Sequence, residues 1–232
     1  VTQAIYDEPS NRWLVTTDQG ESISATYLVT AVGCLSAAQV PDIAGRENFA
    51  GPSYHTGEWP HEMVDFSGKR VGVIGTGSSG IQAIPIIAQQ AAHLTVFQRT
   101  PNFSIPSRNT TLSAERVDEI KRNIKSIREF CRWSTIGQPY DFKQEEALKL
   151  NRDVVEQQLE SDWQKGGFEW MFGSYSDLVF DKDANDLASN FVRKKISDVV
   201  NDPNIAEKLM PRDYPIASKR LPLDNGYFET YN

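Results

Sequence analysis

The sequence has few cysteines and histidines, no basic excess and no long apolar run. Its 232 residues include 2 Cys and 3 His and carry a formal net charge of −7 at pH 7. Domains that bind nucleic-acid phosphates normally carry a basic excess, so we predict no nucleic-acid partner. The longest apolar stretches, such as 28–32 and 71–74, have the length of strands and fall far short of the roughly 20 residues of a membrane span. We therefore predict no membrane partner.

The two cysteines, Cys34 and Cys131, are too few for a disulfide scaffold and lie in no metal-ligand spacing. We expect both to be buried free thiols in a reducing cytoplasm, and we assign Cys34 no chemistry. The stretch from Asp181 begins like a calcium loop, but Asp186 stands where such a loop needs glycine and Val192 where it needs a bidentate glutamate. We predict that this stretch caps a following helix, and we predict no metal site.

The bulk composition, with 39% hydrophobic and 24% charged residues, is that of an ordinary globular protein. The chain starts at Val1, inside a strand-like pattern, and its first residues show no charged region followed by an apolar one. No signal peptide is therefore predicted. We expect the chain to be an internal segment of a longer, cytoplasmic protein.

Residue patterning predicts three successive regions. Three β-branched or alternating runs separated by turn residues predict a β-meander, at 1–6, 12–17 and 22–30. The third run continues as an apolar strand to Gly33, which we expect to be buried. A β–turn–α–β unit follows, with its strands at 70–74 and 94–98 and its helix at 81–92, where Pro85 is expected in the first turns.

From about 106 to 214, apolar residues recur at helical spacing. Ser113 is expected to cap a helix with one apolar face, made by Val117, Ile120, Ile124, Ile127, Phe130 and Cys131. Further helices are predicted over 154–163 and 187–200, the second ending before Pro203. We interpret this region as a helical insertion in a nucleotide-binding fold.

A G-x-G-x-x-G motif lies between the strand and the helix of the β–turn–α–β unit, as Gly75-Thr76-Gly77-Ser78-Ser79-Gly80. Gly75 permits the tight turn, Gly77 lets the backbone approach a pyrophosphate, and Gly80 lets helix and strand pack closely. The phosphates are expected at the helix N-terminus, where amide hydrogens and the dipole favour negative charge. A glycine-rich turn without a ligand also matches the bare pattern, but the flanking elements favour dinucleotide binding. We include Gln82 among the cofactor-binding residues.

The end of the second strand predicts which dinucleotide is bound. An NAD site usually places Asp or Glu there, about 20 residues after the motif, to hold the ribose hydroxyls. This chain has Gln98, Arg99 and Thr100 instead. Arg99 can pair with a 2′-phosphate, so NADP is favoured over NAD. The alternative is an ordinary surface arginine after a strand.

Immediately upstream of this unit, Phe49, Gly51, His55, Trp59 and Pro60 form the pattern F-x-G-x-x-x-H-x-x-x-W-P. Such a histidine and tryptophan alone would be interpreted as a hydrogen-bonded imidazole and a packed aromatic ring. The whole segment, however, resembles the fingerprint of Baeyer–Villiger monooxygenases. The resemblance implies that it is a linker which couples cofactor binding to domain movement.

The stretch 218–221 is similar to the active-site K-R-hydrophobic stretch of the same family. The resemblance implies that Lys219 holds the 2′-phosphate together with Arg99 and Thr100. It also implies that Arg220 is catalytic, supporting the negatively charged, oxygen-carrying flavin. Arginine suits that role because it stays charged when partly buried.

The fold implied is α/β, a Rossmann-like FAD/NAD(P)-binding fold of three layers, with a parallel central sheet, a β-meander and a helical insertion. We expect residues 1–36 to belong to an FAD-binding domain. Residues 37–105 and 215–232 are expected to form the NADPH-binding domain, and residues 106–214 the insertion.

The implied reaction is carried out by a flavin-dependent NADPH monooxygenase. It uses FAD, NADPH and O₂ to insert one oxygen atom beside the carbonyl of a ketone, which gives an ester or lactone. The family has two glycine-rich nucleotide motifs and this chain has one. We therefore predict that residues 1–232 alone hold FAD poorly and do not catalyse the reaction.

Two alternatives stay open. One is a flavin monooxygenase that oxidises nitrogen or sulfur, although such enzymes carry Phe or Tyr at the position of Trp59. The other is a non-catalytic NADP-binding module. The sequence indicates neither which ketone is the substrate nor the oligomeric state.

Overall fold

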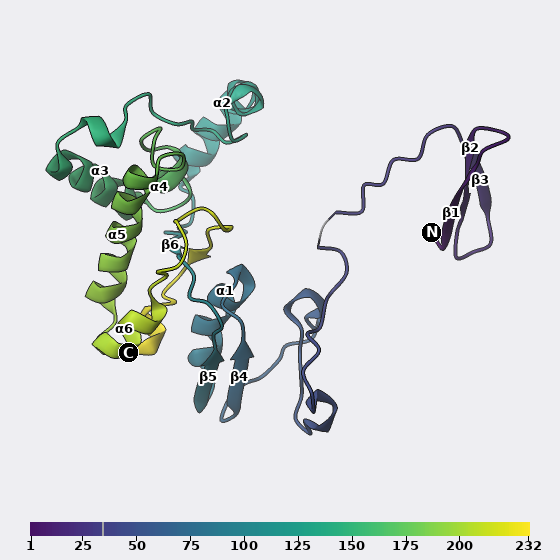
Figure 1. The fold of residues 1–232 in the computed structure, drawn as a ribbon, viewed down its shortest axis with the longest axis horizontal. Coiled ribbons are helices and arrows are strands. Elements are labelled where there is room, and N and C mark those ends of the chain that lie inside the picture. The colour runs from purple at the N-terminus through teal and green to yellow at the C-terminus, as the bar shows by residue number, and fades with distance from the viewer. Residues whose placement is uncertain (34) are drawn as a thin grey trace. The chain divides into compact units, whose positions relative to one another are not determined.

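The computed structural model describes residues 1–33 and 35–232, so Cys34 lies outside the described residues. The chain divides into two compact units, Val1–His61 and Glu62–Asn232 (Figure 1). The domain boundaries expected near residues 36, 105 and 214 stay predictions.

The first unit contains the predicted β-meander. Strands β1 (Gln3–Asp7), β2 (Arg12–Thr16) and β3 (Ser22–Ala25) pair antiparallel in sequence order. Tyr6 lies opposite Trp13 in the register, and their rings contact each other at a centroid distance of 5.2 Å. Two short 3-10 helices follow, η1 (Arg46–Asn48) and η2 (Thr56–Glu58).

The third strand is shorter than predicted. Strand β3 ends at Ala25, and residues 27–33 lie outside any strand, with the side chains of Tyr27 and Val29 each 84% exposed. The apolar, β-branched composition of this segment favours a buried strand. A strand needs a neighbour to pair its backbone groups, however, and within the described part of the chain no strand pairs with 27–33.

The second unit begins with the predicted β–turn–α–β arrangement. Strands β4 (Arg70–Ile74) and β5 (His93–Phe97) are parallel neighbours, joined through helix α1 (Ser78–Ala88). The side chains of Ile81 and Ile84 on α1 are fully buried. The opposite face of the two strands is open, with Ile74 69% and Phe97 56% exposed.

Helix α1 starts three residues earlier than predicted. The chain turns from extended backbone at Gly77 directly into the helix at Ser78, so the second half of the glycine motif is itself helical. Pro85 is therefore the eighth residue of the helix rather than part of its first turns. A proline there cannot donate a hydrogen bond to the carbonyl of Ile81. Pro85 is buried inside the helix.

The rest of the second unit is mainly helical. Its elements are β6 (Ile105–Pro106), α2 (Ala114–Trp133), η3 (Ala147–Lys149), α3 (Arg152–Lys165), α4 (Glu169–Phe172), α5 (Lys182–Val199), α6 (Pro203–Leu209), β7 (Leu223–Asp224) and η4 (Glu229–Tyr231). The core is built around fully buried side chains such as Trp170 and Ile196. No helix among residues 1–33 and 35–232 is long and apolar enough to span a membrane. The cytoplasmic location stays a prediction.

The predicted helix caps are present. The side chain of Ser113 accepts from the backbone N–H of Arg116 at the start of α2, and that of Asp181 accepts from Asp183 and Ala184 at the start of α5. The stretch that begins like a calcium loop therefore caps a helix, as predicted. Helix α5 ends before Pro203, which then occupies the first position of α6.

The apolar face of α2 is less buried than its pattern indicates. None of its residues is fully buried, and Ile124 and Phe130 are 44% and 49% exposed. Cys131, expected to be buried, is a half-buried free thiol on the same helix. Amphipathic spacing predicts that an apolar face exists, but it does not say whether another element covers that face.

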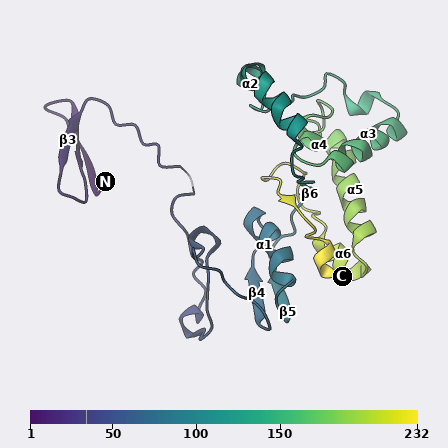
Figure 2. The same cartoon turned by 180° about the vertical axis from the view of Figure 1, so that it is seen from behind.

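The C-terminal segment joins the two parts of the second unit. Strands β6 and β7 pair in parallel, Ile105 opposite Leu223, and β7 contacts α1. The buried amide of Asn185 on α5 donates to and accepts from the backbone of Ile216. In both views this yellow segment lies between α1 and α5 (Figures 1 and 2). It thereby brings residues 214–224 to the segment that follows β5.

Candidate dinucleotide-binding site

Two glycines of the motif are required by the geometry of the turn. Gly75 has φ +97°, a backbone conformation that side-chain-bearing residues rarely adopt, and its N–H donates to the carbonyl of Phe97 at 2.9 Å. At Gly80, a Cβ would lie 2.4 Å from the carbonyl oxygen of Gly75. Helix α1 therefore lies so close to the end of β4 that no residue with a side chain fits at position 80.

Gly77 is glycine for neither of these reasons. Its φ of −78° is open to any residue, and a Cβ there would meet no atom within 4 Å. The motif thus leaves free space at the N-terminus of α1, where Ser78, Ser79 and Gly80 present the first helical amides. Such amides have no partner within the helix. This space and these donors fit the phosphates of a dinucleotide.

The motif is tied to the loop after β5. The hydroxyl of Thr76 donates to the carbonyl of Thr100 at 3.2 Å, and the amide of Asn102 donates to the carbonyl of Thr76 at 3.3 Å. Thr76 is only 7% exposed, so its side chain supports the turn. The two segments predicted to bind opposite ends of one phosphate-rich ligand are therefore neighbours.

Arg99 lies in that loop with its side chain exposed. Among the residues that the structure describes, its guanidinium has neither an ion-pair nor a hydrogen-bond partner. The site also lacks the carboxylate with which an NAD-binding strand would end, because Gln98, Arg99 and Thr100 occupy its place. A free cation here fits a ligand with a 2′-phosphate.

Lys219, on the C-terminal segment, is linked to the same loop through Tyr214. Its ammonium lies 4.0 Å from the ring centroid of Tyr214, and the Tyr214 hydroxyl donates to the carbonyl of Pro101 at 2.8 Å. Lys219 is thus held near the loop that carries Arg99. Arg220 follows it and is exposed.

Gln82, on the exposed side of α1, donates from its amide to the carbonyl of Leu223 at 3.4 Å. It therefore joins α1 to β7. Its assignment as a cofactor-binding residue stays a prediction.

A buried carboxyl group bonds to the segment that follows β5 and was not predicted. Asp224, 7% exposed, accepts a hydrogen bond from the hydroxyl of the fully buried Ser104. Its other oxygen accepts from the backbone N–H groups of Gly226 and Tyr227. Burial raises the pKa of Asp224, and these hydrogen bonds oppose the rise. The sequence has no local signal for this pair, because Ser104 and Asp224 are 120 residues apart.

The fingerprint loop, residues 49–60, lies in the first unit. The Nδ1 atom of His55 accepts from the N–H of Gly57 at 3.1 Å, which caps η2. Tyr54 and Trp59 contact each other at a ring-centroid distance of 5.7 Å. A Cβ at Gly51 would lie 2.7 Å from the ring of Phe49. The loop thus folds its aromatic rings over its own backbone.

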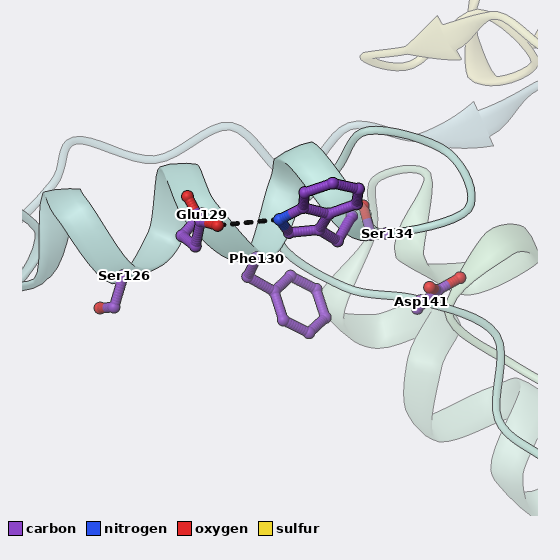
Figure 3. A pocket seen from close by; sticks show the side chains of 6 residues that line it. Ser126, Glu129, Phe130, Ser134 and Asp141 are labelled. Atoms are coloured by element: carbon purple, nitrogen blue, oxygen red, sulfur yellow. Dashed lines mark hydrogen bonds between the residues drawn. The ribbon is translucent and has the colours of Figure 1, made fainter.

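A shallow hollow at the end of α2 is separate from these residues (Figure 3). It is lined by Ser126, Glu129, Phe130, Trp133, Ser134 and Asp141. The indole N–H of Trp133 donates to Glu129 at 2.8 Å, shown as the dashed line. No predicted cofactor residue lines this hollow, so it contributes nothing to the dinucleotide site.

Comparison with known proteins shows which enzymes the chain resembles. No protein-family model matches the chain. Over its whole length, however, it is 42% identical to the cyclohexanone 1,2-monooxygenase of Acinetobacter sp and 42% identical to a Baeyer-Villiger monooxygenase of Pseudooceanicola batsensis. Its relatives therefore include Baeyer–Villiger flavin monooxygenases. It spans about 42% of the length of these two relatives.

Solved structures agree with this resemblance to Baeyer–Villiger monooxygenases. The chain superposes on OTEMO in complex with FAD and NADP with a TM-score of 0.96 at 38% identity, and on oxidized steroid monooxygenase bound to NADP with a TM-score of 0.92 at 46% identity. The two superpositions include 100% and 99% of this chain, respectively. They include 44% of each solved chain. The predicted α/β, Rossmann-like fold class is confirmed. A phenazine N-monooxygenase of Lysobacter antibioticus is also 42% identical, over 100% of this chain and 42% of that protein.

Proposed function

We propose that this chain forms the NADPH-binding part of a Baeyer–Villiger monooxygenase. The whole enzyme then uses FAD, NADPH and O₂ to convert a ketone into an ester or lactone. The observation that carries the proposal is the open space at Gly77 in front of α1, next to a loop whose Arg99 has no ion-pair partner among the described residues.

The residues of this chain have distinct tasks in the proposal. The amides at the start of α1 bind the pyrophosphate, and Arg99, Thr100 and Lys219 bind the 2′-phosphate. When bound, NADPH supplies the hydride and FAD carries the oxygen that is transferred. Arg220 stabilises negative charge that develops at the flavin, because its guanidinium keeps its proton.

The proposed domain arrangement follows the same assignment. Residues 1–36 belong to an FAD-binding domain, 37–105 and 215–232 to the NADPH-binding domain, and 106–214 to a helical insertion. The loop 49–60 acts as the linker that couples cofactor binding to domain movement.

Calorimetric titration of the 232-residue chain with NADP⁺ and NAD⁺ tests cofactor binding. We expect NADP⁺ to bind more tightly. Arg99→Ala should weaken NADP⁺ by about 10- to 100-fold, as expected for loss of a hydrogen bond to a charged group, and leave NAD⁺ unchanged. Binding of neither nucleotide by the unaltered chain would overturn the proposal.

The predicted lack of activity of the chain alone has its own test. We expect the purified 232-residue chain to be colourless and to show no ketone-dependent NADPH oxidation. Its one glycine-rich motif is assigned to NADPH, which leaves FAD without a phosphate-binding turn of its own. A yellow, flavin-loaded chain that turns ketones into esters would contradict this.

Nitrogen oxidation is a second candidate. It is favoured by the 42% identity to a phenazine N-monooxygenase, which equals the identity to cyclohexanone 1,2-monooxygenase. The test is product analysis with a flavin-loaded enzyme that contains these 232 residues. Esters or lactones from cyclic ketones support the first candidate, and N-oxides from aromatic amines support the second.

A further inference from the structure

Tyr214 links the two segments that carry the proposed 2′-phosphate residues. Its hydroxyl donates to the carbonyl of Pro101 at 2.8 Å and lies 3.1 Å from Oδ1 of Asn102. Its half-buried ring contacts Phe103 edge-on, at a centroid distance of 5.5 Å. Both the ring and the hydroxyl of Tyr214 thereby contact the segment that follows β5.

The backbone between Tyr214 and Lys219 is fixed independently. Ile216 is buried and its N–H donates to Oδ1 of Asn185 at 3.1 Å. Ala217 has φ +67°, in the left-handed region, which turns the chain sharply. The Ser218 hydroxyl then bonds back to the carbonyl of Pro215 at 2.7 Å. This turn returns Lys219 to the face of the Tyr214 ring.

The Lys219 ammonium lies over that ring, 4.0 Å from its centroid. The side chain is exposed, and within the described residues no carboxylate pairs with it. A free lysine has a long, flexible stem with many rotamers, so ordering it on a ligand opposes binding. Attraction between the ammonium and the electron-rich face of the ring orders Lys219 before any ligand arrives.

We propose that Tyr214 is a positioning residue that sets the preference for NADPH over NADH. It holds Lys219 beside the loop of Arg99 and Thr100, so that two cations face one 2′-phosphate. The inference rests on the proposed function, in which Lys219 binds that phosphate. Because NADH has no 2′-phosphate, Tyr214 should affect NADP⁺ binding and leave NAD⁺ binding unchanged.

The test is a set of titrations on the 232-residue chain and its Tyr214 variants. Tyr214→Phe keeps the ring and loses the hydrogen bond to Pro101, so NADP⁺ affinity should fall by no more than about threefold. Tyr214→Leu removes the ring, and a fall of about 3- to 10-fold is expected. NAD⁺ affinity should stay the same in both. Tyr214→Met, which fills the volume without an aromatic face, replaces Leu if thermal unfolding shows that the Leu variant is not folded.

A double-mutant cycle with Lys219→Ala separates positioning from a general structural effect. If Tyr214 acts through Lys219, then Tyr214→Leu should not lower the NADP⁺ affinity further in a chain that already carries Lys219→Ala. Full additivity of the two losses, or an equal fall in NAD⁺ affinity, overturns the inference. Failure of the unaltered chain to bind either nucleotide overturns the proposed function instead, and the inference with it.

Discussion

Gly77 in the turn 75–80 and the glycines of the fingerprint loop 49–60 have opposite uses. In the turn, Gly77 faces open space, where an added Cβ would meet no atom within 4 Å. In the loop, such a Cβ would lie 2.7 Å from the ring of Phe49 at Gly51, and 3.2 Å from the imidazole of His55 at Gly57. The space at Gly77 is open to another molecule, whereas the space at the two loop glycines is occupied by side chains of the loop.

This contrast bears directly on function. Space that no part of the chain fills, next to helical amides, is what a phosphate-binding turn requires. At the glycines of the loop, side chains of the loop itself occupy that space instead. The fingerprint is therefore better explained by the geometry of the loop than by direct contact with substrate.

The largest expected effect is that of Gly80→Ala. The new Cβ would lie 2.4 Å from the Gly75 carbonyl, a backbone atom that cannot rotate away. We expect the free energy of unfolding to fall by about 1–3 kcal/mol, as for other overpacked sites, and NADP⁺ binding to be lost. Thermal unfolding and calorimetric titration measure the two effects. Unchanged stability would show that the helix does not need its close approach to β4.

Gly77→Ala is the matched control and should affect only binding. Its backbone conformation suits alanine and the methyl group meets no protein atom. We expect stability to change by no more than about 0.5 kcal/mol, because alanine is a slightly poorer helix cap. NADP⁺ affinity should fall by more than about tenfold, since the methyl group occupies the space of the phosphates. Unaltered NADP⁺ affinity would contradict this assignment of the space.

The buried carboxyl group of Asp224 predicts a pH effect. Burial raises the pKa of Asp224, so the carboxyl group binds its proton more tightly in the folded chain than in the unfolded chain. Its contribution to stability is therefore fully present below the unfolded pKa and is lost as the pH rises through the folded pKa. Denaturant unfolding from pH 4 to 7 should show that the stability of the unaltered chain, relative to Asp224→Asn, declines as pH rises. A constant difference would mean that Asp224 titrates normally.

The smallest effect is expected at Gly51→Ala. The Cβ would approach Cζ of Phe49, the tip of a side chain that is 66% exposed and can swing into solvent. We expect stability to change by less than about 0.5 kcal/mol, as at most surface positions, and NADP⁺ affinity of the chain to stay the same. A fall in NADP⁺ affinity would show that the loop and the turn are coupled within these 232 residues.

Local sequence patterns predicted the elements that depend on neighbouring residues. The strand–glycine turn–helix–strand order and the caps at Ser113 and Asp181 were all predicted, because a tight turn or a cap is decided within a few residues. The boundaries were less accurate, as the early start of α1 shows. Family resemblance, rather than spacing or composition, predicted the roles of Lys219 and Arg220.

The sequence alone therefore determined the glycine-rich turn and the resemblance of this protein to Baeyer–Villiger monooxygenases. Tertiary structure decided how the C-terminal segment is joined to the segment after β5, through the hydrogen bonds from Tyr214 to Pro101 and from Ser104 to Asp224, which join residues 113 and 120 positions apart. It also decided that the end of the third predicted strand and the apolar face of α2 are exposed. Periodicity shows which side chains are able to pack, but only the arrangement of distant segments determines what they pack against.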